Sequence, residues 1–176
     1  MAVRVKIRDR DKGWARLKKQ LAKAAGAYVK SGLPEATGGE EHEDEDGKPS
    51  GHTVAAIGWF NEFGTMRNGK EHVPERSFIR STHDENLLQI ASMKKRLLKK
   101  MLDKKMGIRK ALNVLGQFMK KEIQAKIVNL RSPANAPSTI KRKDSSNPLI
   151  ATGQMRQSVD YEVVLPKGGA KRARFT

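Results

Sequence analysis

The stretch IRKALNVLGQFMKKEIQAKIVNL, residues 108–130, decides the fold of this chain of 176 residues. Its apolar side chains recur every three or four residues, which is the period of one face of an α-helix. That face consists of Ile108, Ala111, Leu112, Leu115, Phe118, Met119, Ile123 and Ile127. The segment 77–106, which is followed by Gly107, has the same periodicity, and a break is expected near His83. The sequence therefore predicts two successive amphipathic helices.

Short strands are expected on both sides of this helical pair. The segment VRVKIR, residues 3–8, alternates apolar and basic side chains, as a half-buried strand does. A helix over about 11–25 leads to a second strand within 27–34, and a last strand over 161–165 follows a short helical turn. The residues therefore give the order strand, helix, strand, helices, strand.

Composition limits both the architecture and the chemistry. One domain is expected over residues 1–166, followed by a basic tail over 167–176. The 36 Lys and Arg residues against 19 Asp and Glu give a net charge of +17, so an anionic partner has to be considered. The absence of cysteine excludes disulfides, thiolate metal sites and cysteine nucleophiles. No apolar run is long enough to predict a membrane span.

Residues 35–51 form an acidic segment that predicts a mobile loop, because glycine, proline and like charges occur without an apolar anchor. Its central acids are Glu40, Glu41, Glu43, Asp44, Glu45 and Asp46. A cation held by His42 among the acids is one interpretation, although the spacing matches no calcium-binding loop. A solvated loop is the expectation that needs fewest assumptions.

The segment IGWFNEFGT, residues 57–65, predicts a short helix that begins after a Thr53 cap and ends at Gly64. Helical spacing suggests that it buries Trp59, Phe60 and Phe63. Glu62 beside these rings could have the raised pKa of a general acid, but no nucleophile or second acid accompanies it. We therefore expect Asn61 and Glu62 to make structural hydrogen bonds at the end of the helix or between subunits.

Two proline-containing segments read as extended loops, one over residues 64–78 and one over residues 132–153. The second is expected to be an ordered functional loop.

The basic segments allow a second class of function. They could contact nucleic acid without sequence preference, although no helix-turn-helix, zinc module or aromatic-basic interleaving is visible. Solvated helix faces, or attraction to acidic proteins, explain the same residues. An enzyme such as a nuclease is a third reading, in which carboxylates gather around a metal; its candidates are Glu62, Glu71, Glu75 and Asp84.

Three blocks of the sequence, taken in order, resemble a known family. They are VAAIGWFNEFGT, VPERSFIRSTHDEN and NAPSTIKRKDSSNPLIATGQMRQSVDYEV, which fall between about residues 52 and 165. They resemble the neck and tail-completion proteins of tailed bacteriophages, the virion morphogenesis or head-to-tail joining family. The chain departs from that pattern at Ala151, where aspartate is common, at Ser77, where proline is frequent, and in its acidic segment.

The resemblance implies a structural virion protein and not an enzyme. It implies an α+β fold, in which a small, mostly antiparallel sheet is packed with amphipathic helices and joined by long extended loops, and this fold agrees with the order of strands and helices read from the residues. It implies a homo-oligomeric ring, expected to have six subunits, that joins the head connector to the tail and leaves a passage for DNA. Its partners would be other copies of itself, head-connector or adaptor proteins, and tail-terminator or tail-tube proteins, with transient DNA contact and no cofactor or membrane. Assembly would take place in the host cytoplasm. A tail terminator and a non-specific nucleic-acid-binding protein are the alternatives.

In such a ring, the two proline-containing segments are expected to contact neighbouring subunits or partners. Together with the helix before Gly64, they supply the assembly residues, which are Trp59, Phe60, Asn61, Glu62, Phe63, Pro74, Arg76, Phe78, Pro137, Ile140, Pro148, Leu149 and Met155. The acidic segment would either face the channel, where like charge lets DNA slide, or dock on a basic patch of the neighbouring ring.

Overall fold

The computed structural model describes residues 18, 19, 21, 22, 24–44, 46–103 and 105–166. The expected strand over 3–8, the basic tail over 167–176 and Glu45 lie outside the described residues, as does most of the helix expected over 11–25. The described residues from 18 to 24 are helical.

The structure is α+β, as predicted: 52% of the residues are helical and 17% are in strands. The strands form three two-stranded antiparallel sheets. The helices are α2 (Glu35–Gly38), α3 (Val54–Phe63), α4 (Arg80–Glu85), α5 (Leu87–Leu102), α6 (Ile108–Asn129), α7 (Pro137–Lys143) and α8 (Gln154–Ser158). The strands pair as β1 (Tyr28–Gly32) with β6 (Asp160–Val164), β2 (Glu41–Glu43) with β3 (Pro49–Thr53), and β4 (Thr65–Arg67) with β5 (Lys70–Val73). The expected strands within 27–34 and 161–165 thus pair with each other as β1 and β6, whereas the other two ribbons lie largely in segments that were expected to be loops.

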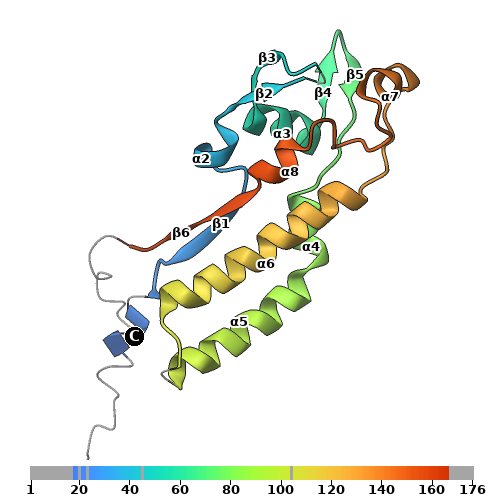
Figure 1. Cartoon of the computed structure of the whole chain (residues 1–176). Helices are drawn as coiled ribbons and strands as arrows, with labels where there is room; N and C mark the ends of the chain where they lie inside the picture. The colour runs from blue at the N-terminus through green and yellow to red at the C-terminus, as the bar shows by residue number, and fades with distance from the viewer. Residues whose placement is uncertain (1–17, 20, 23, 45, 104, 167–176) are drawn as a thin grey trace, which may run out of the picture.

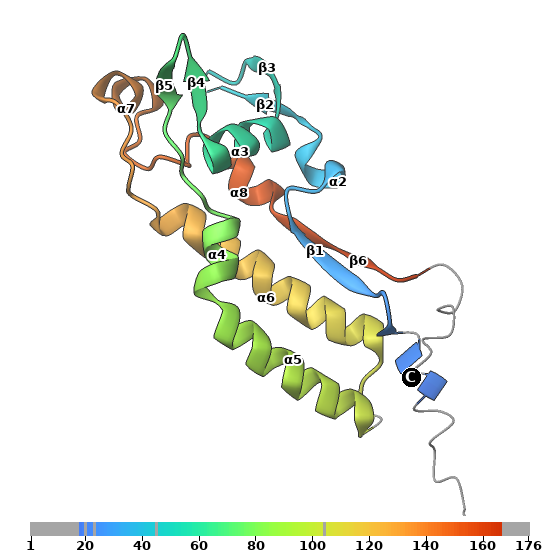
Figure 2. The ribbon, with the colours of Figure 1, turned by 180° about the vertical axis from the view of Figure 1, so that it is seen from behind.

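The molecule is elongated and has two parts (Figure 1). We call one part the stem; it consists of α5, α6 and the β1–β6 ribbon. We call the other part the head; it gathers α2, α3, α7, α8 and the two hairpins β2–β3 and β4–β5. Helix α5 runs beside α6 in both views, and α4 leads from α5 toward the head (Figure 1, Figure 2).

Helix α6 connects the two parts because its buried face contributes to both cores. In the stem, Ala111, Leu115 and Met119 pack with Ile90, Leu97 and Met101 of α5. In the head, Ile123 and Ile127 pack in a second cluster with Val54, Phe78, Leu149, Met155 and Val159. These positions follow the period predicted for residues 108–130, so the sequence prediction of the long helix is confirmed. The predicted break is confirmed as well, just beyond His83 at Asn86.

The β1–β6 ribbon lies closely on α6. Tyr28 pairs with Val164 and Gly32 with Asp160 at the two ends of the ladder. A Cβ at Gly116 of α6 would overlap ring atoms of Tyr161, so glycine is what allows the helix and the strand to approach this closely. Lys120 adds an ion pair with Asp160 at 3.0 Å. Burial raises the pKa of Asp160, but the Lys120 ammonium and the Tyr161 N–H lower it by more, so that the net shift is downward.

Three segments expected to be loops contain regular structure. Residues 35–51 include α2 and most of the β2–β3 hairpin, in which Asp44 Oδ1 accepts the N–H groups of Asp46 at 3.0 Å and Lys48 at 2.8 Å. The absence of regular structure predicted there is therefore wrong. Residues 65–73 form the β4–β5 hairpin, whose turn is built from Asn68 and Gly69, both with positive φ. The loop after α6 likewise contains α7.

No helix among the described residues is long and apolar enough to span a bilayer.

Candidate assembly site

Helix α3 has the predicted limits but an unexpected orientation. Thr53 caps it by accepting the Ala56 N–H at 3.2 Å, and Gly64 ends it with φ of 70°. The buried residues are Val54, Gly58 and Glu62, which are four residues apart and share one face. The side chain of Trp59 is 58% exposed and that of Phe63 47% exposed. The prediction that the helix buries these two rings is therefore wrong; Phe60 alone is half-buried.

Glu62 points inward because it meets the unpaired N–H groups where α4 begins. Its Oε2 accepts the N–H groups of Phe78 at 2.8 Å and Ile79 at 2.9 Å, and its Oε1 accepts that of Arg80 at 3.0 Å. The Ser77 hydroxyl donates to Oε1 at 2.8 Å, and Arg80 Nε donates to it at 3.1 Å. One carboxylate thus joins the end of α3 to the start of α4, which confirms the structural role expected for Glu62.

The electrostatics of Glu62 do not suit a general acid. Burial raises the pKa of Glu62, but the hydrogen bonds from Ile79, Arg80, Ser77 and Phe78 outweigh burial and hold the pKa below its ordinary value. The group is therefore a carboxylate at neutral pH, and its oxygens are already occupied by donors from the same chain. A catalytic proton donor would need the opposite shift.

The end of β3 and the outer face of α3 together present a series of rings, which we call the aromatic row: His52, Phe60, Trp59 and Phe63. Neighbouring ring centroids are 5.3 Å, 6.2 Å and 5.1 Å apart along this order. The guanidinium of Arg80 lies 4.6 Å from the Phe63 centroid, while it also pairs with Glu75 at 2.6 Å. The row is thus held on the outside of a helix whose inside is fixed by Glu62.

Arg76 joins the two proline-containing segments by hydrogen bonds within the chain. It is 5% exposed; its Nε donates to Pro133 O at 2.8 Å, and its Nη2 donates to Ala134 O and to Asn135 Oδ1, each at 3.1 Å. Its own N–H donates to Asn61 O at 2.7 Å. The side-chain amide of Asn61 donates to Ile57 O at 2.9 Å, which is a bond within the helix. The two segments therefore meet each other within one chain.

Six of the predicted assembly residues need correction because they are buried inside the single chain and offer no surface to a neighbour. They are Glu62, Arg76, Phe78, Pro148, Leu149 and Met155. Three are exposed: Trp59, Phe63 and Pro137, the last at the first position of α7. Phe60, Asn61, Pro74 and Ile140 are partly exposed.

The head also contains an open groove of about 900 Å³ between the β2–β3 hairpin, α3 and the segment around α7. Acidic Asp44 and Asp46 line it together with basic Arg76, Arg142 and Lys143. The four carboxylates considered for a nuclease are not assembled there. Across the described residues, no group of three or more His, Asp or Glu side chains is placed to hold a metal. The acids of residues 40–46 are likewise not gathered into such a group where the structure describes them.

Several residues that build this site were missed by sequence reasoning. Ser77 and Arg80 complete the Glu62 network, and Asn147 donates to Val128 O at 2.9 Å near the end of α6. A serine directly before the apolar start of a helix is a usable capping signal for Ser77. No local pattern identifies Asn147, since its partner lies nineteen residues away.

Comparison with known proteins adds no identity, since no family model, curated protein or solved structure matches this chain.

Proposed function

We propose that the chain is a structural subunit that assembles with copies of itself into a ring at the head–tail junction of a tailed bacteriophage. In this role it joins the head connector to the tail, as a neck or tail-completion protein, and leaves a passage for DNA. The proposal combines the sequence resemblance over residues 52–165 with the surface of the head. It assigns no catalytic step to the protein.

The observation that carries the proposal is the aromatic row. Trp59 and Phe63 are large side chains that a single folded chain has reason to bury, yet they are about half exposed or more. They are also held in place, because Glu62 ties the inner face of α3 to α4. Tryptophan and arginine dominate the energetics of protein interfaces, and Arg80 lies directly over Phe63. A rigid aromatic surface of this kind suits contact with another protein.

A second candidate is non-specific nucleic-acid binding, which the net charge of +17 favours. Such binding requires cations that lie along the nucleic-acid backbone, and it does not require an aromatic side chain held on a helix. The two kinds of binding should therefore be disrupted by different changes. Salt should release a polyanion, whereas loss of an aromatic ring should release a protein partner.

Sedimentation velocity of the purified chain separates these candidates. Wild type is expected to sediment as a multiple of its 19.6 kDa mass. Trp59→Ser should weaken self-association at least about tenfold, as loss of a central interface residue does. Tyr28→Ser is the matched control, since Tyr28 is 47% exposed but lies on β1 in the stem. A wild-type chain that stays monomeric and binds duplex DNA in a salt-dependent way would contradict the proposal and favour the second candidate.

A further inference from the structure

Helix α5 has two apolar faces, and only one of them is covered. Ile90, Leu97 and Met101 are buried against α6. Four other leucines of the same helix are exposed to solvent; Leu88 is the most exposed, at 86%. We call them the leucine stripe: Leu87, Leu88, Leu98 and Leu102. A helix on the surface of a monomer normally has one apolar stripe, so the second face of α5 lacks a partner.

The surroundings of the leucine stripe are strongly cationic. From residue 87 to 102, α5 contains five basic side chains and no acidic one: Lys94, Lys95, Arg96, Lys99 and Lys100. None of the five forms an ion pair in the part of the chain that the structure describes. Lys95 and Lys99 are one turn before Leu98 and Leu102 respectively, by helical spacing close to the stripe. Two α5 helices would therefore repel each other, which disfavours symmetric pairing of this face with itself.

The opposite charge lies on the head of the same molecule. The β2–β3 hairpin and the residue before it contain Glu40, Glu41, Glu43, Asp44 and Asp46, and its one lysine, Lys48, pairs with Asp46 at 3.7 Å. The hairpin is fixed, because the Glu43 N–H donates to Gln154 Oε1 and Gln154 Nε2 donates to Glu41 O, each at 3.0 Å. The aromatic row begins at His52 on β3, so apolar side chains adjoin these acids.

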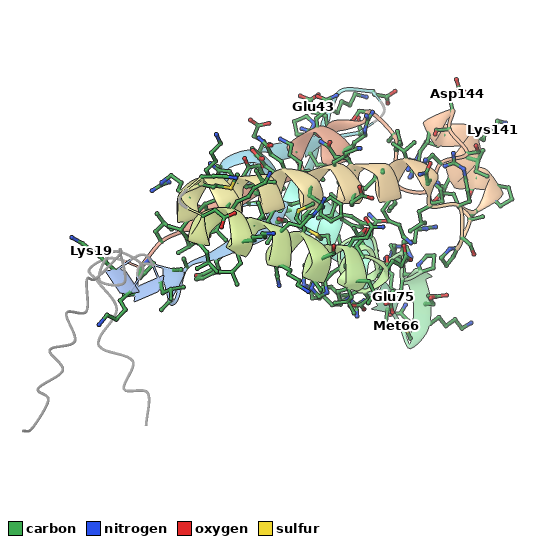
Figure 3. The ribbon with its side chains drawn as sticks, turned by 90° about the horizontal axis from the view of Figure 1, so that it is seen from below. Lys19, Glu43, Met66, Glu75, Lys141 and Asp144 are labelled. Carbon is green, nitrogen blue, oxygen red and sulfur yellow. The ribbon has the colours of Figure 1, made fainter. Side chains whose placement is uncertain are left out.

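The acidic hairpin and the leucine stripe belong to different parts of one molecule. In Figure 1 the hairpin is in the head, whereas α5 runs down the stem to its far end. Figure 3 shows Glu43 on the head and Lys19 beyond the opposite end of the stem. Within one chain the hairpin packs on α3 and is hydrogen-bonded to Gln154 of α8, and α5 packs on α6. The complementary charges therefore do not face each other within one molecule, whereas they could face each other between two copies.

We propose that the acidic hairpin of one copy docks on the leucine stripe and lysines of α5 in the next copy. Such a contact uses two different surfaces, so it repeats from head to stem, and it closes a ring when the rotation between copies allows. This inference rests on the proposed ring and specifies the contact that would build it. It also gives the acidic segment a defined neighbour, the basic face of an identical chain.

Charge reversal on each surface tests the contact. A stem variant, Lys95→Glu with Lys99→Glu, and a head variant, Glu40→Lys with Glu43→Lys, should each weaken self-association about tenfold or more, because like charges then face each other. An equimolar mixture of the two variants should regain association, since each reversed surface then meets its complement. The control is Glu71→Lys with Glu162→Lys, two exposed acids outside the hairpin whose reversal changes the net charge as much as the head variant does.

The outcomes separate this inference from the proposed function. If wild type and both variants form the same oligomer, the ring stands and this contact is wrong. If the mixture fails to recover association, the two surfaces do not meet, and the contact is again wrong. If the stem variant loses only binding to a labelled DNA duplex while its oligomer is unchanged, the lysines serve a polyanion and the inference is overturned. A wild-type chain that is monomeric contradicts the proposed function itself.

Discussion

Glu62 shows how one buried anion can organise a fold without taking part in chemistry. Its carboxylate accepts five hydrogen bonds from residues 77–80, which lead into α4, and it is 3% exposed. Removing the charge would leave N–H groups in the core without an acceptor, and such groups cost more than the net value of the bonds they lose. Glu62 therefore has a structural role, because its partners are backbone N–H groups and side chains of the same chain.

Glu62→Gln should therefore destabilise the protein by about 2 to 4 kcal/mol at neutral pH, since the amide replaces one acceptor oxygen with a donor. The sign of the pH dependence follows from the lowered pKa. A carboxylate with a depressed folded-state pKa adds stability above its unfolded pKa of about 4.3, and that stability is lost as the pH falls through the folded-state pKa. Urea denaturation at several pH values should thus show the largest gap between wild type and variant near pH 7, and a shrinking gap below about pH 4.

The matched control for this prediction is Glu75→Gln. Glu75 pairs with the same Arg80, but its side chain is 57% exposed. An exposed pair contributes about 1 kcal/mol or less, so this variant should remain close to wild type. Equal unfolding midpoints for Glu62→Gln and wild type at pH 7 would show that the network does not stabilise the fold.

Sequence reasoning placed α3 correctly but assigned its faces incorrectly, and the cause is physical. Apolar residues occur almost all round this helix, so periodicity alone does not select the buried side. Ranking by hydrophobicity then favours Trp59 and Phe63 for the core and Glu62 for the surface. What reverses the order is the set of free N–H groups at residues 78–80, which lie beside α3 only after the chain has folded.

At the scale of elements, α5 and α6 were predictable because each has a local helical periodicity and Gly107 separates them. The β2–β3 hairpin was not, since its strands contain mostly charged or small residues and depend on cross-strand bonds and on Gln154. The β4–β5 hairpin had a usable signal in Asn68-Gly69. The three separate ribbons could not have been read from the sequence, because pairing between β1 and β6 joins residues more than a hundred positions apart.

Gly116→Ala should report the closeness of α6 and β6. Alanine favours a helix over glycine by about 1 kcal/mol, but overpacking costs about 1 to 3 kcal/mol when neighbouring atoms are forced to move. Because the new methyl group would overlap the Tyr161 ring, we expect net destabilisation of about 1 kcal/mol in thermal unfolding. Gly107→Ala, at the start of the same helix with no atom within 4 Å, should change stability little. A Gly116→Ala protein more stable than wild type would contradict the close packing.

At the scale of the whole molecule, the exposed apolar side chains lie beside charges of opposite sign in the head and in the stem. The head exposes rings beside acids, and the stem exposes leucines beside lysines. Sequence composition already indicated separated charges, but it could not place them on different parts of an elongated molecule. This arrangement leaves a single chain with two unsatisfied surfaces of opposite sign, which a head-to-stem contact would satisfy together.

Negative-stain electron microscopy of the purified chain tests the central claim most directly, because it detects closure as well as association. At low ionic strength, where charged surfaces are screened least, the account predicts closed rings of uniform subunit number. High salt should reduce their abundance. The claim that this protein is an assembly subunit would be contradicted if the purified chain gave only isolated particles of single-chain size at every salt concentration.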